Sequence, residues 1–338
     1  METASAPFRG FGAVRFRAGR AALRPTSCGS AGRPPRWHID GMRARVLGSG
    51  AGGGLPQWNC GCSNCTRARA GEGSVPPRTQ PSLAVSADGQ RWSLVNASPD
   101  VRQQLAHFPG LHPRPGTRDL PLDTIVLTNA DLDHVLGLLV LREALPYRIV
   151  STGWVRDALL RHNAVFRILE PAWGSVKLDE TLPLDRDCKL EARLFPVPGR
   201  VPTHLGNLVS NAPEATTGVR LTDTRTGRRI VYIPGMRAMD GGVVAELEGA
   251  ACAFADGTFF TANELASTRP GAPDALAMGH APISGEGGSL HRLAALPGRR
   301  LYTHLNNTNP LVDARSAERN WVEATGVEVA HDGLEVEI

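Results

Sequence analysis

Three cysteines stand close together in the sequence, at Cys60, Cys62 and Cys65. In the pattern C-x-C-x-x-C, three thiolates can converge on one ion from a single tight loop, and zinc prefers four sulfur or nitrogen ligands in a tetrahedron. The pattern therefore predicts a structural zinc site whose fourth ligand comes from elsewhere in the chain. Three incidental buried cysteines and a redox C-x-x-C pair are the alternatives. A redox pair needs a helix N-terminus to lower the thiol pKa, whereas the Asn, Gly and Ser residues around these cysteines predict irregular backbone.

A second group of metal ligands follows an expected buried strand over Asp123–Thr128. Asp133 and His134 come shortly after that strand, and another expected strand, Arg300–His304, ends in a histidine. An isolated Asp-His pair is more typical of a helix cap beside a surface histidine, and the second histidine is what favours a metal site. One carboxylate and two imidazoles with open positions are the ligand set of non-haem Fe(II) oxygenases, although zinc or manganese also accepts these ligands.

The bulk composition is that of a globular protein, with 338 residues, 41% hydrophobic residues and a formal net charge of +4. Residues 1–41 carry much of that positive excess and show no periodicity, so we expect a disordered basic extension before one domain over residues 42–338. Because the remainder is close to neutral, the charge does not indicate nucleic-acid binding. No apolar run reaches membrane-spanning length and no secretory h-region opens the chain, so we expect a cytoplasmic protein.

The order of expected elements is strands and hairpins first, then alternating strands and helices, twice over. This order predicts an α+β fold in which two β-sheets pack together with helices outside. The expected hairpins are Ser82–Val85 with Trp92–Asn96, Val219–Leu221 with Arg229–Ile233, and Val327–Ala330 with Leu334–Ile338. The expected helices are His134–Leu145, Val155–Asn163, Gly242–Gly249, Leu290–Ala295 and Ser316–Thr325.

A glycine-rich stretch over Gly48–Gly54 contains a G-x-G-x-x-G match. A dinucleotide-binding fingerprint requires a helix to begin at the third glycine. Here Leu55–Asn59 leads directly into the cysteines, so we reject that interpretation. We expect these glycines to let a loop backbone pass close to another part of the chain or to a ligand.

Taken together, these residues resemble the metallo-β-lactamase superfamily and, within it, the PqqB family. The superfamily places the metal motif H-x-H-x-D-H after a buried strand, where this chain has N-A-D-L-D-H over Asn129–His134. The resemblance spans residues 42–338 and implies a four-layer αββα sandwich of two mixed sheets flanked by helices. The segments that carry it are Gly50–Cys60, Arg78–Ser82, Leu94–Asp100, Asp133–His134 with Gly137–Leu139, Asp256–Thr258, Met278–His280 and His304–Pro310.

The resemblance also implies a step in the biosynthesis of pyrroloquinoline quinone (PQQ). It implies an iron- and O2-dependent hydroxylase that acts on the tyrosine of a Glu–Tyr unit derived from the PQQ precursor peptide, with Fe(II) at the active site and a separate structural zinc. A carrier that moves PQQ or its precursor toward the periplasm is the alternative, and a hydrolase of the superfamily is the third. The expected partners are the Glu–Tyr precursor and O2, with no nucleic acid and no membrane, and a homodimer is left open.

The chain departs from the hydrolases at the first of their two metal sites. Asn129 and Asp131 replace the first two histidines of the motif, and Gly235 aligns with the usual bridging aspartate. Hydrolases of this kind activate water between paired ions. The resemblance therefore implies a single active-site ion, held by Asp133, His134 and His304.

Four further residues complete the predicted site. By the resemblance, His280 is a proton-transfer or substrate-positioning group, with a structural loop histidine as the alternative, and Asp256 orients His280 or a metal ligand or caps its loop. Asp131 is a further metal ligand, a partner of a ligating histidine, or an acid at a helix N-terminus. Asn307, three residues beyond His304, is the expected fourth zinc ligand, although an amide oxygen binds zinc poorly.

Overall fold

The computed structural model describes residues 41–143 and 147–338, which fall within one compact unit. The predicted disordered extension over residues 1–41 and the end of the helix predicted over His134–Leu145 lie outside the described residues, apart from Gly41.

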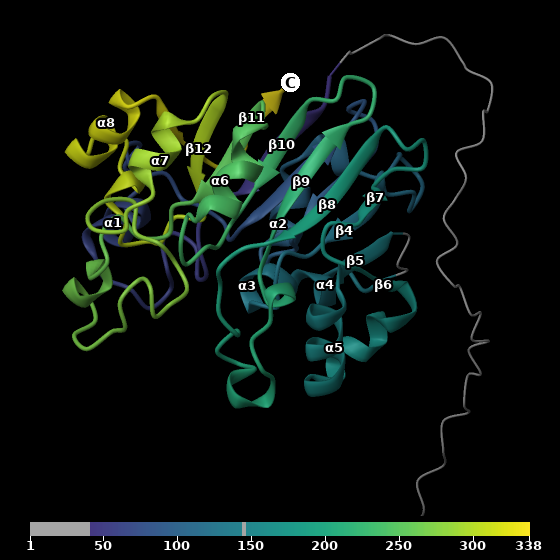
Figure 1. Ribbon diagram of the computed structural model, residues 1–338, viewed down its shortest axis with the longest axis horizontal. Coiled ribbons are helices and arrows are strands. Elements are labelled where there is room, and N and C mark those ends of the chain that lie inside the picture. The colour runs from purple at the N-terminus through teal and green to yellow at the C-terminus, as the bar shows by residue number, and fades with distance from the viewer. Residues whose placement is uncertain (1–40, 144–146) are drawn as a thin grey trace, which may run out of the picture. The chain divides into compact units, whose positions relative to one another are not determined.

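In the described residues the chain forms two seven-stranded sheets (Figure 1). The first has the order β14-β1-β2-β3-β4-β5-β6, antiparallel from β14 to β3 and parallel from β3 to β6. Its strands are β1 (Arg43–Gly48), β2 (Ser82–Ser86), β3 (Trp92–Val95), β4 (Leu122–Val126), β5 (Arg148–Thr152), β6 (Trp173–Val176) and β14 (Glu335–Glu337).

The second sheet has the order β13-β12-β11-β10-β9-β8-β7 and is also mixed. Strands β10 to β13 are parallel, and β7 to β10 are antiparallel. Its strands are β7 (Thr181–Pro183), β8 (Leu190–Pro196), β9 (Thr217–Asp223), β10 (Arg229–Tyr232), β11 (Cys252–Asp256), β12 (Arg299–Thr303) and β13 (Val327–Val329).

Helices cover the outer face of each sheet, so the layers are helix, sheet, sheet and helix. Helices α2, α3, α4 and α5 pack on the first sheet, and α1, α6, α7 and α8 pack on the second. The helices are α1 (Ser63–Arg69), α2 (Val101–Ala106), α3 (Leu132–Val135), α4 (Gly137–Val140), α5 (Gly153–His162), α6 (Gly241–Glu248), α7 (Leu290–Ala295) and α8 (Ala317–Ala324).

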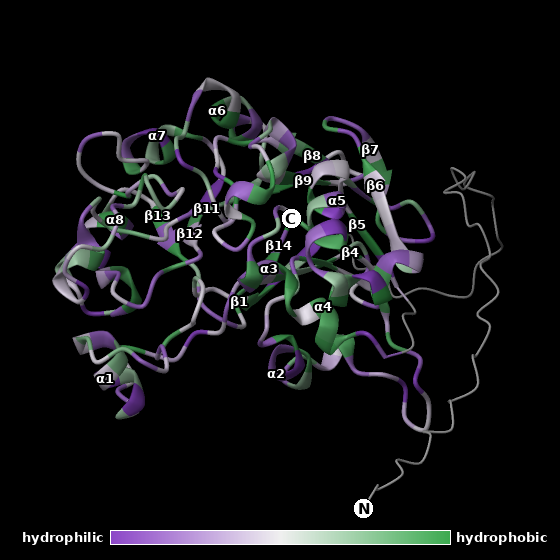
Figure 2. Ribbon diagram, turned by 90° about the horizontal axis from the view of Figure 1, so that it is seen from below, coloured by the Kyte–Doolittle hydropathy of each residue, from purple (hydrophilic) through white to green (hydrophobic). Residues whose placement is uncertain are grey.

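The period-2 alternation of side chains along the strands builds this layering. On β4, Ile125 faces the helices while Val126 faces the other sheet, and on β12, Leu301 faces the first sheet while Tyr302 faces the helices. Figure 2 shows β4 and β5 as largely hydrophobic and helices α2 and α5 as carrying hydrophilic stretches. The predicted four-layer αββα sandwich is confirmed.

The predicted C-terminal hairpin is wrong, because its two strands join different sheets. β13 pairs with β12 in the second sheet, whereas β14 pairs with β1 in the first. Between these strands, the Asp332 carboxylate accepts hydrogen bonds from Ser49 and Thr79, which ties the connecting turn to the first sheet. Two adjacent alternating runs indicate strands but do not specify their partners.

The helix predicted from His134 is interrupted after one turn. α3 ends at Val135, Leu136 lies between, and α4 begins at Gly137. Gly137 donates its N–H to Ala97 O at 2.9 Å, and Ala97 N donates to His134 O at 2.8 Å. This pair of bonds fixes α3 against the loop after β3, so Asp133 and His134, two of the predicted metal ligands, stand on a turn that is held in place.

The glycine-rich stretch forms a loop, which confirms that no dinucleotide-binding helix begins there; α1 starts only at Ser63. The loop instead passes close to the predicted metal site. A Cβ added to Gly52 would lie 3.4 Å from Asp133 Oδ2, and Ala51 N donates to Leu305 O at 2.8 Å. In the described part of the chain, every helix is too short or too polar to cross a bilayer.

Gly137→Ala tests the close contact between α3 and the loop after β3, which the hydrogen bonds of Ala97 to Gly137 and His134 maintain. An added Cβ would lie 2.2 Å from Ser98 O and 2.6 Å from Ala97 O, so backbone would have to move. We expect the free energy of unfolding to fall by about 1–3 kcal/mol, as in other overpacked sites. Gly153→Ala is the matched control, because its added Cβ meets nothing within 4 Å. Chemical denaturation measures both, and equal effects of the two substitutions would contradict this close contact.

Candidate metal centre

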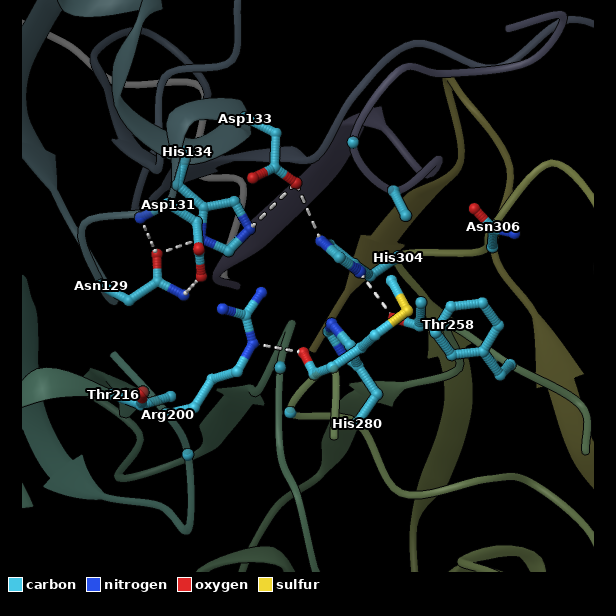
Figure 3. Close-up of a pocket in the computed structure, with 17 residues that line it drawn as sticks. Asn129, Asp131, Asp133, His134, Arg200, Thr216, Thr258, His280, His304 and Asn306 are labelled. Atoms are coloured by element: carbon cyan, nitrogen blue, oxygen red, sulfur yellow. Dashed lines mark hydrogen bonds and ion pairs between the residues drawn. The ribbon is translucent and has the colours of Figure 1, made fainter. Parts of the chain in front are cut away.

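Two sheets contribute the ligands of the predicted active-site metal. Asp133 and His134 lie on α3, after β4 of the first sheet, and His304 follows β12 of the second sheet. Figure 3 shows the three side chains pointing toward one another. Each of the three residues offers one ligand atom, and these three atoms lie within 4.8 Å of one another. The structure thus brings together the residues that the sequence predicted as ligands of one ion.

The His134 ring is held through its Nδ1 atom. Asn129 Oδ1 lies 2.6 Å from Nδ1, and Thr128 Oγ1 lies 3.3 Å away. Because Asn129 Oδ1 can only accept, Nδ1 carries the proton and Nε2 is left with a free lone pair. His134 Nε2 is buried without a hydrogen-bond partner and lies 3.8 Å from Asp133 Oδ2. An unpaired buried nitrogen is costly unless a ligand satisfies it.

The His304 ring is oriented in the same way from the second sheet. Thr258 Oγ1 lies 2.7 Å from His304 Nδ1, and His304 Nε2 lies 3.2 Å from Asp133 Oδ2. His304 has a φ of 59°, in the left-handed region that a non-glycine residue rarely adopts. Such backbone is concentrated at functional sites, where the surrounding structure maintains it.

The electrostatics of the three residues fit a bound cation. Burial lowers the pKa of His134 to about 4, so this imidazole stays neutral. Burial opposes ionisation of Asp133, but nearby His134 and the hydrogen bond from His304 lower its pKa well below the usual range. Burial alone would lower the pKa of His304, yet Asp133 raises it. A cation between these atoms would replace the proton that His304 and Asp133 share and would satisfy the free nitrogen of His134.

Asp256 and His280 form a second pair beside the three ligands. Asp256 Oδ2 accepts from Met236 N at 2.9 Å and lies 2.7 Å from His280 Nδ1, while Oδ1 accepts from Thr258 N and Oγ1 at 3.0 and 2.6 Å. Asp256, His280 and His304 also offer ligand atoms within 4.8 Å of one another. Because both Asp256 oxygens are already satisfied, we infer an orienting role for this carboxylate. His280 Nε2 is then the nitrogen available to a ligand in the cavity.

Asp131 is linked to His134 through Asn129. Asn129 Nδ2 donates to Asp131 Oδ2 at 2.9 Å, and Asp131 N donates to Asn129 Oδ1 at 3.0 Å. Although Asp131 precedes α3, its side chain makes no capping bond to the helix. Burial and the nearby charge of Asp133 raise the pKa of Asp131 to about 6. Of the three predicted roles, this geometry favours the indirect partner of a ligating histidine.

Two donors of the paired-metal hydrolases are missing from this site. Asn129 is engaged with His134 and Asp131, and Gly235 lines the cavity with no side chain at all. A Cβ at Gly235 would lie 3.7 Å from His280 Cε1, so a side chain there would reach the site. The amide and the glycine remove two donors that a paired-metal hydrolase uses, while Asp256, His280 and His304 remain close to one another.

The ligands open into a cavity of about 180 Å³. Sequence reasoning missed three residues that shape it: Thr258, which orients two histidines; Asn129, regarded only as a lost ligand; and Arg200. The sequence could have indicated two of these residues, because Asn129 lies in the metal motif and Thr258 comes two residues after Asp256. Nothing in the sequence indicates Arg200. The cavity is lined by Ala51, Gly52, Asn129, Asp131, Asp133, His134, Gly199, Arg200, Thr216, Gly235, Thr258, Phe259, Met278, Gly279, His280, His304 and Asn306.

The three cysteines form a second cluster, with sulfur atoms within 4.8 Å of one another. The expectation of irregular backbone around them is wrong, because Cys62 is the N-cap of α1 and its Sγ accepts from Cys65 N at 3.5 Å. Cys60 Sγ accepts from Cys62 N at 3.5 Å, and Cys65 Sγ accepts from Gln57 N at 3.3 Å. Backbone N–H groups are thus directed at all three sulfurs.

The helix that a redox C-x-x-C pair requires is present, because α1 begins directly after Cys62, but a third thiol beside that pair favours a metal site. Burial raises the pKa of Cys65 to about 12. At Cys60, burial works against ionisation, but hydrogen bonds from Cys62 and Asn307 lower the pKa. Three thiols this close cannot all ionise alone, whereas a bound zinc ion supplies the charge that deprotonates them together.

The Asn307 side chain occupies the predicted fourth position. Its amide nitrogen lies 3.1, 3.6 and 3.3 Å from the sulfurs of Cys60, Cys62 and Cys65. A half-turn about χ2 exchanges this nitrogen with Oδ1, which would then face the same centre. Asn64 Nδ2 donates to Asn307 O and Asn309 O at 3.0 and 3.1 Å, which ties α1 to the segment after His304. Ligation by Asn307 stays a prediction.

Comparisons with known proteins agree with this geometry. A family model described as the β-lactamase superfamily domain matches residues 91–305. Coenzyme PQQ synthesis protein B of Rhizobium meliloti (strain 1021) is 46% identical over 305 residues, which cover 88% of this chain and 98% of that protein. The protein of the same name from Methylobacterium sp. (strain 4-46) is 44% identical over 301 residues, covering 87% and 99%.

Solved structures give the same result. The crystal structure of Zn²⁺-bound PqqB from Methylobacterium extorquens has a TM-score of 0.82 and 41% identity, covering 88% of this chain and 100% of that one. A diphosphatase of the PhnP family has a TM-score of 0.61 and 20% identity, covering 88% and 97%, and shows a shared fold alone.

Thr258→Val tests how the histidines are oriented. Thr258 Oγ1 lies within hydrogen-bond distance of His304 Nδ1, His280 Nδ1 and Asp256 Oδ1, so its loss frees the ligand ring. We expect metal affinity at the active site to fall by about 10–100-fold. Thr303→Val is the matched control, because the buried Thr303 hydroxyl has no partner. Competition with a chromophoric chelator measures both variants, and equal affinities would contradict the orienting role.

Cys65→Ser tests the coupling of the cysteine cluster to the active site. We expect the variant to lose about one zinc per chain, to melt at a lower temperature and to bind the active-site metal more weakly, since Asn307 and His304 share one segment. Cys252→Ser replaces another buried free cysteine, far from the cluster in sequence, and should keep its zinc. Elemental analysis and thermal unfolding provide the readouts. Full zinc retention in Cys65→Ser would refute the predicted ligand set.

Proposed function

The chain belongs to the family of coenzyme PQQ synthesis protein B within the β-lactamase superfamily, and we propose that it hydroxylates the tyrosine of a Glu–Tyr precursor of PQQ using Fe(II) and O2. The names of its relatives support a role in PQQ synthesis. The Zn²⁺-bound relative and the three groups of potential ligand atoms support a metalloprotein. The reaction itself and the choice of Fe(II) are the proposal.

A single observation carries it: three donors for one ion lie together, whereas two positions that supply metal donors in the hydrolases carry an amide and a glycine. Asp133, His134 and His304 supply one carboxylate and two imidazoles on one side. This is the ligand set of non-haem iron oxygenases, in which Fe(II), when bound, supplies O2 activation and open coordination positions. A paired-metal hydrolase would need donors where Asn129 and Gly235 stand, which disfavours hydrolysis.

The chain's own residues orient the reactants and move protons. His280 Nδ1 faces the Asp256 carboxylate, so the proton stays on Nδ1 and Nε2 is a base within the cavity. A phenol in that cavity can give its proton to His280, with Asp256 stabilising the imidazolium. In the overall reaction a ring C–H becomes C–OH, the second oxygen atom of O2 leaves as water, and a small-molecule reductant supplies two electrons and two protons.

The test is reconstitution without oxygen. Protein with zinc in the cysteine cluster receives Fe(II) anaerobically, then Glu–Tyr, ascorbate as the reductant, and O2. Mass spectrometry should detect a dipeptide that is heavier by one oxygen atom and that carries label from ¹⁸O2. His134→Ala should lower the rate by more than about 100-fold. Substitution of a residue that only hydrogen-bonds to a metal ligand already lowers metal affinity or activity by about 10–100-fold. His291→Ala, an exposed histidine on α7, should have no effect.

Three outcomes would contradict the proposal. Binding of PQQ or its precursor without O2-dependent turnover would indicate the carrier. Peptide or ester hydrolysis with zinc or manganese at the active site would indicate a hydrolase. Product formation that survives His134→Ala would place the chemistry elsewhere.

A further inference from the structure

Arg200 stands in the cavity beside the metal ligands and has no role in the chemistry described above. Among the described residues that line this cavity, it is the only arginine or lysine. The remaining charged groups that line it are carboxylates and histidines. Arg200 is half-buried, and a fixed positive charge at the wall of a cavity can attract and orient an anionic ligand.

The protein holds Arg200 in one orientation. Nε donates to Met278 O at 2.6 Å, and Nη1 donates to Val201 O and Thr203 Oγ1, each at 3.0 Å. The aliphatic part of the side chain lies against Gly279, where an added Cβ would come within 2.9 Å of Arg200 Cγ. Gly279, with a φ of 91°, therefore provides the slot in which the arginine lies.

These bonds leave one end of the guanidinium for a ligand. A guanidinium has five N–H donors, and the three bonds above use only Nε and Nη1. Both N–H groups of Nη2 remain, and Figure 3 shows the guanidinium directed into the site. Among the described residues that line the cavity, no carboxylate forms an ion pair with Arg200; Asp131 also lines it, and its Oδ2 accepts from Asn129 Nδ2 at 2.9 Å.

We propose that Arg200 binds a carboxylate of the substrate and so positions a phenol-bearing acid in front of the metal ligands. Phe259 and Met278 line the cavity beside His280, which suits an aromatic ring. A guanidinium whose orientation is already fixed gives a carboxylate charge-assisted hydrogen bonds with little loss of entropy. The class of substrate is a small phenolic amino acid or dipeptide with a free carboxylate. This deepens the proposed function and rests on it for the phenol.

Equilibrium binding tests the proposal separately from turnover. Metal-loaded protein is titrated anaerobically by calorimetry with Glu–Tyr, with 3-(4-hydroxyphenyl)propionate, and with the amide of that acid. Arg200→Gln should weaken binding of both acids by about 10–100-fold, the usual effect of losing a hydrogen bond to a charged group, and leave binding of the amide unchanged. Arg237→Gln, an exposed arginine that does not line the cavity, should behave as wild type. Arg200→Lys keeps the positive charge but lacks the planar pair of N–H donors, so its affinity for the acids should lie between those of wild type and Arg200→Gln.

The outcomes separate this proposal from the proposed reaction. If Arg200-dependent binding of the acids is found but no hydroxylation occurs, the carboxylate site stands and the reaction is wrong. Equal losses for acid and amide, unchanged binding in a folded Arg200→Gln protein, or no binding of the acids to wild type would overturn the proposal. Tighter Arg200-dependent binding of inorganic phosphate than of either acid would also overturn it, because the site would then select a phosphate ester. If Arg200→Gln does not fold, the acid-to-amide ratio in Arg200→Lys decides.

Discussion

The hydrogen bonds to Nδ1 of His134 and His304 are the constraint on which this site depends. An Asn129 oxygen holds one ring and a Thr258 hydroxyl holds the other, so both Nε2 atoms face Asp133 Oδ2. These partners come from different sheets, because Asn129 follows β4 and Thr258 follows β11. The two-sheet sandwich is therefore what assembles the site, and neither sheet contains it alone.

The cysteine cluster extends this dependence beyond the active site. The segment after β12 begins with His304, continues to Asn307 at the sulfurs, and reaches Asn309, which donates to Gly257 O and Thr258 O. A zinc ion at the cysteines would thus hold in place the backbone segment that carries His304. The same segment contacts Thr258, which orients the His304 ring. Metal binding and local folding are expected to be coupled in such an arrangement.

Much of this could be predicted from sequence where local signals sufficed. The order of the expected strands and helices predicted two packed sheets with helices outside. The clustered cysteines predicted one set of ligand atoms, and the polar residues that follow two buried strands predicted the other. The predicted pairings of β2 with β3 and of β9 with β10 are confirmed, whereas β13 and β14 were wrongly paired with each other. Strands β6 and β7 were missed because they are short and contain Gly or Pro. The helix at Cys62 was missed because its capping bond uses a cysteine sulfur, and the role of Arg200 depends on Met278 and Gly279, far away in sequence.

The central claim is that the active site holds one ion, while a zinc ion occupies the cysteine cluster. Anomalous diffraction from crystals of iron- and zinc-loaded protein, collected at both absorption edges, tests it most directly. The account predicts one iron peak between Asp133, His134 and His304 and one zinc peak between the sulfurs of Cys60, Cys62 and Cys65. A pair of metal peaks in the active site, with the second beside Asp256 and His280, would contradict it.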